Sequence, residues 1–236
     1  MTKRHYTASS KMADLLSDHY HVFLLFFNLG MRLGIAEKTV GEVCKEQNID
    51  LDSFLVLVHF ILEDEAKESH TALADLDVSL LIRFLKNSHV YFLDYRLPQI
   101  AEKLDETLDS APKEIRIVTH KFFDEYAREV RLHMSYENEV VFPYVEQLLL
   151  GNTSDDYSIS IFEKKHDQVE LKMLELKNIL IKYYTGDFSP ALSNVLHELY
   201  ACGRELQTHN AIEDRLFIPA ITEIETTLRA DEYEEK

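Results

Sequence analysis

The sequence predicts an all-α protein in which a small helical N-terminal domain precedes a four-helix bundle. Six glycines and five prolines in 236 residues leave long stretches without helix breakers, and 46% of the residues are hydrophobic. Apolar residues recur there at spacings of three and four, and no alternating strand pattern competes with them. The polar stretch 63–77 separates the two parts, so we expect domains at residues 1–76 and 77–236.

Several short helices are expected in the N-terminal domain. Thr39 and Glu42 have the spacing of a capping box, which predicts a helix that begins there and ends near Asn48. Asp50 or Asp52 can then cap the apolar helix that follows.

The second domain contains four long helical patterns, over residues 78–108, 112–150, 159–184 and 190–228. Each pattern places apolar residues on one face, which is typical of the buried seam of a bundle. Polar residues stand on these seams where apolar ones belong. They are His89, His133, Glu137, His166, His209 and Glu213.

These residues belong to an internal repeat. Residues 133–143 and 209–219 both read His-x3-Glu-x5-Pro, with an offset of 76. A further histidine precedes each copy, His89 by 44 residues and His166 by 43. Because residues four apart share one helix face, each copy aims an imidazole and a carboxylate at the same point.

The chemistry of these six side chains suits a pair of iron ions. Imidazole binds iron, and a carboxylate favours hard ions and can bridge two of them, whereas zinc would need fewer ligands. Glu137 and Glu213 on an apolar seam also require a cation to offset the cost of burial. With an oxo or hydroxo bridge, each iron would keep a position open for oxygen, nitric oxide or peroxide. Manganese is an alternative to iron.

Other interpretations of the motif are weaker. A single histidine on a seam is usually a packing residue, and a metal-free structural bundle would explain one His-x3-Glu pair, but two copies in register favour a metal site. The Glu-x2-His pattern of ferritin-like sites occurs only at residues 163–166.

Two further pairs follow the same offset of 76. Glu129 and Glu205, each one turn before a histidine of the repeat, could orient the imidazoles or simply be solvated. Pro143 and Pro219 are expected to kink or fray their helices.

The second domain resembles the hemerythrin-like (HHE) bundles, and nearly the whole chain resembles the di-iron proteins for repair of iron centres (RIC). Residues 88–98 are similar to the first bundle helix of that family. Oxygen-carrying hemerythrins use a fifth histidine, but Phe162 and Glu170 stand one turn either side of His166 here. The resemblance maps the four histidines and two bridging carboxylates of the family onto His89, His133, Glu137, His166, His209 and Glu213.

Residues 33–55 are similar to the small domain that precedes the bundle in the RIC proteins. Those proteins carry an adjacent cysteine pair in a glycine-rich loop, where this chain has residues 36–38, Ala-Glu-Lys, and no thiol. A thiol-dependent role of the domain is therefore in doubt, and Cys44 is interpreted as a packing residue.

The resemblance implies a non-haem di-iron protein of the nitrosative or oxidative stress response, which repairs iron–sulfur clusters by iron donation and reacts with nitric oxide or oxygen. Its partners would be a gaseous ligand and iron–sulfur client proteins. One alternative is an oxygen or nitric oxide sensor that donates no iron. Another is an enzyme that reduces nitric oxide or peroxide.

Composition sets the remaining expectations. A net charge of −17 disfavours nucleic acid and anionic membranes as partners. Two cysteines without a disulfide pattern, no leader-like segment, and an apolar run at 22–27 too short to span a bilayer predict a cytoplasmic protein. We expect a monomer or a homodimer.

Overall fold

The computed structural model describes residues 5–62, 76–109, 111–154, 156–163 and 169–234. The prediction of an all-α fold is confirmed, because these residues contain no β-strand. The chain divides into two compact units, Met1–Ser88 with Ile212–Lys236, and His89–Ala211. The domain boundary at residue 76 stays a prediction.

The N-terminal part of the first unit consists of α1 (Met12–Asp18), α2 (Val22–Asn28), α3 (Val40–Glu46) and α4 (Leu51–Leu62). The predicted capping box is present, because the Thr39 hydroxyl accepts from the Glu42 N–H and the Glu42 carboxylate accepts from the Thr39 N–H. Asn48 then takes a left-handed conformation with φ 52°, and Asp50 caps α4 by accepting from the Ser53 N–H at 2.8 Å. The two short helices therefore begin where the sequence predicts.

The loop between α2 and α3 contains residues 36–38, where the sequence has no cysteine pair. The Gln47 side chain fixes its backbone, accepting from the Arg32 N–H at 2.7 Å and donating to the Arg32 carbonyl at 3.0 Å. Cys44 is fully buried in α3, as expected of a packing residue.

The four predicted long helices are present as runs of shorter elements. They are α5 (Val78–Val90), η2 (Tyr91–Arg96) and α6 (Leu97–Leu108); α7 (Lys113–Tyr136), η3 (Glu137–Val141) and α8 (Phe142–Leu149); α9 (Ile159–Glu163) and α10 (Val169–Tyr183); and α11 (Pro190–Ile212), η4 (Glu213–Phe217) and α12 (Ile218–Glu234). The last run extends beyond its predicted end at Leu228.

The elements η2, η3 and η4 are π-helical turns, and each is followed by a proline. Pro98, Pro143 and Pro219 are the second residues of the α-helices that follow. Proline lacks an N–H and its ring conflicts with the carbonyl one turn earlier, so a widened turn lets the helix continue. The helices therefore continue past Pro143 and Pro219 and do not fray there, and the expected kink stays a prediction.

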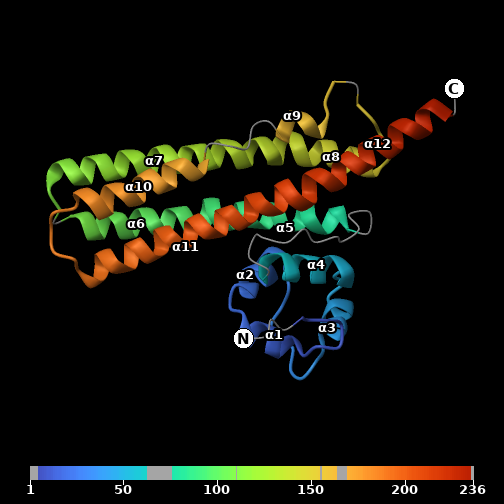
Figure 1. Ribbon diagram of the computed structural model, residues 1–236, viewed down its shortest axis with the longest axis horizontal. Coiled ribbons are helices and arrows are strands. Elements are labelled where there is room, and N and C mark those ends of the chain that lie inside the picture. The colour runs from blue at the N-terminus through green and yellow to red at the C-terminus, as the bar shows by residue number, and fades with distance from the viewer. Residues whose placement is uncertain (1–4, 63–75, 110, 155, 164–168, 235–236) are drawn as a thin grey trace. The chain divides into compact units, whose positions relative to one another are not determined.

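The second unit has its core between α6, α7, α10 and α11, which run alongside one another (Figure 1). The predicted seam residues are buried there, among them Tyr126 and Val130 of α7, Leu176 of α10, and Leu199 of α11. Within the residues that the structure describes, none of the helices is both long and apolar enough to cross a membrane.

Candidate metal centre

Glu137 lies between two imidazoles that come from different helices. It opens η3 and is completely buried. Its Oε2 lies 2.8 Å from Nε2 of His89, at the end of α5, and its Oε1 lies 2.8 Å from Nε2 of His133, one turn earlier on α7. One carboxylate therefore faces a different imidazole with each of its oxygens.

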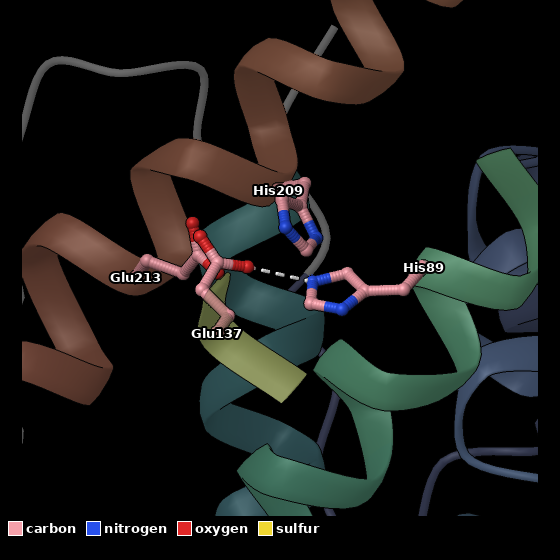
Figure 2. Close-up of side chains that lie close together, drawn as sticks. All are labelled: His89, Glu137, His209 and Glu213. Carbon is pink, nitrogen blue, oxygen red and sulfur yellow. Dashed lines mark ion pairs between the residues drawn. The ribbon is translucent and has the colours of Figure 1, made fainter. Parts of the chain in front are cut away.

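His209 and Glu213 stand one turn apart where α11 passes into η4. Both are buried, His209 with 2% and Glu213 with 0% of its surface exposed. One ligand atom from each of His89, Glu137, His209 and Glu213 can be chosen so that all four lie within 4.8 Å of one another. Figure 2 shows the two imidazoles and the two carboxylates converging from three separate helical runs.

The structure thus brings together four of the six predicted ligands in one cluster. His133 contacts this cluster through Glu137 and is slightly more exposed, with 12% of its side chain accessible. His166 lies outside the described residues, so its proposed role stays a prediction.

The donor set fits a metal ion. Two buried carboxylates this close repel each other unless a cation lies between them, and neutral imidazoles provide no charge. Nε2 of His89 and Nε2 of His133 each lie 2.8 Å from a Glu137 oxygen, so nitrogen and oxygen donors already converge where such a cation would be held.

Aromatic rings enclose the cluster. Phe142 stacks on the His89 ring with centroids 5.5 Å apart, and Phe92 meets the His209 ring edge-on at 6.0 Å. Phe162 stacks on His133 at 6.3 Å. These rings hold the imidazoles in place and lower the local dielectric, which strengthens charge interactions in the site.

Glu205 contacts side chains other than the imidazoles. It accepts from Tyr91 Oη at 3.1 Å and from Arg96 Nε at 3.0 Å. The hydrogen bonds of a π-helical turn join residues five apart, the spacing of Tyr91 and Arg96, and η2 presents both donors to one carboxylate. Burial, and after it the Glu205 charge, raises the pKa of Tyr91. Glu205 therefore holds η2 and α11 together.

Glu129 also has a partner other than an imidazole. Its Oε1 accepts from Lys172 Nζ, which joins α7 to α10. Both glutamates therefore take part in ion pairs between helices, and a role in orienting the imidazoles stays a prediction.

Asn138 is a polar residue that bonds to an imidazole and that the sequence interpretation missed. Its Oδ1 lies 3.1 Å from Nδ1 of His89. The signal was present in the repeat, because an amide or carboxylate residue, Asn138 or Asp214, follows the glutamate in each copy.

Comparison with protein families gives one match for this region. Residues 80–221, more than half of the chain, match the model of the hemerythrin HHE cation binding domain. A comparison with curated proteins gives no match.

Proposed function

Because the chain belongs to the hemerythrin HHE cation-binding family, we propose that its bundle holds two non-haem iron ions and serves in the nitrosative or oxidative stress response. Within that response, we propose that it repairs iron–sulfur clusters by donating iron. The observation that carries the proposal is Glu137, a fully buried carboxylate with each oxygen 2.8 Å from a different imidazole.

The proposed ligand set is that of the sequence repeat. Two oxo- or hydroxo-bridged irons would supply a position for oxygen or nitric oxide and electrons to react with it. The residues that would hold them are His89, His133, Glu137, His166, His209 and Glu213.

The protein's own side chains would control access to the ions. His89 and His209 are at most 2% exposed, so bulk water does not compete for that side of the cluster. His133 is 12% exposed, so that side is the more open one. A gas could reach the site, or an ion leave it, on the His133 side, as both gas binding and iron donation require.

A sensor without iron donation is the second candidate function. It is favoured by the α2–α3 loop, which has no thiol with which to pass iron or electrons onward. The Gln47 side chain fixes the backbone of this loop at Arg32. Such a domain is better suited to protein contact than to thiol chemistry.

A single preparation can separate these functions. The full chain is reconstituted with ferrous iron under anaerobic conditions, and iron per chain and the visible spectrum are measured before and after oxidation. The loaded protein is then mixed with an apo iron–sulfur protein, and cluster assembly is followed. About two irons per chain with cluster assembly would support repair.

Other outcomes of this experiment would support a different function. A spectral change with nitric oxide or oxygen, without cluster assembly, would support the sensor. Sustained consumption of nitric oxide or peroxide with an electron donor would indicate an enzyme. Failure to bind iron would refute the di-iron proposal.

The partners and setting are also proposals. We expect a gaseous ligand and iron–sulfur client proteins, no nucleic acid or membrane partner given the net charge of −17, and a cytoplasmic monomer or homodimer. Light scattering after gel filtration would give the oligomeric state.

A further inference from the structure

We propose that Asn138 is a positioning residue that sets the tautomer and orientation of His89 for metal binding. This inference rests on the proposed function of the site. Asn138 is the second residue of η3, directly after Glu137, and its Oδ1 lies 3.1 Å from His89 Nδ1.

The hydrogen bond determines which ring nitrogen carries the proton. An amide oxygen only accepts, so His89 donates through its Nδ1–H. The Nε2 lone pair then points toward Glu137 Oε2, 2.8 Å away. A cation between these two atoms, a proton or a metal ion, satisfies the contact, and the hydrogen bond from Nδ1 leaves Nε2 as the nitrogen that can bind the metal.

The π-turn explains how adjacent residues reach the two ends of one ring. Glu137 meets His89 at Nε2, Asn138 meets it at Nδ1, and Phe142, just after the turn, stacks on its face at 5.5 Å. Successive side chains of a regular helix diverge by about 100°. Widening of the helix at η3 reduces that divergence, so one short segment holds His89 on three sides.

The position of Asn138 indicates that its side chain orients His89 and does not fill the hydrophobic core. Asn138 is solvent-exposed, whereas the His89 ring that it contacts is 1% exposed. Removing the amide therefore leaves the core intact. A leucine of similar size should fold but lose the acceptor.

The second copy of the repeat has a carboxylate at this position. Asp214 follows Glu213 as Asn138 follows Glu137. An anionic acceptor makes an imidazole a stronger donor than a neutral amide does and stabilises the more positive oxidised metal. Asn138→Asp therefore keeps the hydrogen bond and makes it stronger.

The test compares four full-length proteins, namely the wild type, Asn138→Leu, Asn138→Asp and the control Glu139→Gln. Glu139 is the exposed neighbour on the same turn.

Ferrous iron is titrated anaerobically, and the midpoint potential of the loaded site is measured. We expect about 10- to 100-fold weaker iron binding in Asn138→Leu, because loss of a hydrogen-bond partner of a metal ligand typically costs that much. Asn138→Asp should bind iron at least as tightly as the wild type does, with a more negative potential, and Glu139→Gln should match the wild type in both measurements.

Two results would overturn the inference, and they are distinguishable. Wild-type affinity and potential in both Asn138 variants would refute the role of Asn138 while leaving the iron site in place. Absence of iron from the wild type would refute the proposed function and this inference together. If Asn138→Leu failed to fold, by far-UV circular dichroism, an unchanged potential in Asn138→Asp would still refute it.

Discussion

At the scale of single residues, Glu137 is the side chain on which the metal site depends most. Each of its oxygens lies 2.8 Å from a different imidazole, and the side chain is fully buried. Glu139, two residues later on the same π-turn, is exposed by contrast.

We predict that Glu137→Gln sharply reduces iron binding. The substitution keeps the size of the side chain but removes its charge and one of its two acceptor oxygens, so the two imidazoles lose their shared anion. Iron per chain, measured after ferrous reconstitution, should fall from about two to below one. Glu139→Gln should retain the wild-type content, and retention of two irons by Glu137→Gln would contradict the bridging role.

We predict that both cysteines are unreactive in the native protein. Cys44 and Cys202 are fully buried, and burial raises the pKa of each thiol to about 12. A disulfide reagent at pH 8 should label them only in denaturant, while a thiol introduced by Ser9→Cys at an exposed position should react at once. Rapid labelling of the native wild type would contradict this.

The raised pKa values of the two cysteine thiols also make stability depend on pH in the alkaline range. The folded-state pKa lies above the usual value of 9.0, so folding favours the neutral thiols. Their contribution to stability is complete below about pH 9 and is lost as the pH rises toward 12.

At the scale of elements, Arg96 joins η2 to α11. Its side chain is 9% exposed and donates to Glu205 and Glu198, which are about a quarter exposed. We predict that Arg96→Met lowers the free energy of unfolding by roughly 1–3 kcal/mol, less than for a fully buried pair because solvent screens the carboxylates. Urea unfolding measures the loss.

An exposed ion pair provides the control for this prediction. Arg116 lies 3.5 Å from Asp109, with 41% and 88% of the side chains exposed. Arg116→Met should change stability by about 0–1 kcal/mol. Equal effects of the Arg96 and Arg116 substitutions would contradict a special role for the η2 contact.

The Arg96 contact also predicts a dependence on pH. Burial acts to raise the pKa of Glu198, but the bonds from Lys103 and Arg96 outweigh it and lower the pKa below 4.5. The stability from this pairing is therefore present above about pH 4.5 and is lost as the pH falls through the lowered pKa. Arg96→Met should reduce that loss at acid pH.

The capping box at Thr39 and Glu42 is expected to stabilise α3. Thr39→Ala removes the side chain that accepts from the Glu42 N–H, which typically costs about 1 kcal/mol. Hydrogen exchange of the α3 amides should become about fivefold faster. Thr226→Ala removes a hydroxyl that only bonds the Thr222 carbonyl within α12, so it should leave α3 unchanged. Unchanged exchange in Thr39→Ala would mean that α3 does not depend on its cap.

At the scale of the whole molecule, the four clustered ligands come from segments that are far apart in the sequence. His89, Glu137 and His209 lie on three separate helical runs. We predict that ferrous iron raises the unfolding temperature, because a ligand of the native state adds about 2.7 kcal/mol at a hundredfold excess over its Kd. Calorimetry under anaerobic conditions should show the rise in the wild type and none in Glu137→Gln. A similar rise in both proteins would indicate binding elsewhere.

The sequence alone determined the helices and the composition of the site. Helical periodicity and turn signals are local, so the capping box and the long helices could be predicted within a few residues. The repeat with its offset of 76 identified the polar residues on the seams, because a buried carboxylate on an apolar face requires a partner.

The tertiary structure alone decided which atoms face one another. The prolines were visible in the sequence, but the π-turns before them depend on how each helix continues within the packed bundle. Those turns bring Asn138 to His89 and place Tyr91 and Arg96 on Glu205. Such contacts join segments 49 to 114 residues apart, and no local pattern records them because their geometry arises only when the helices pack.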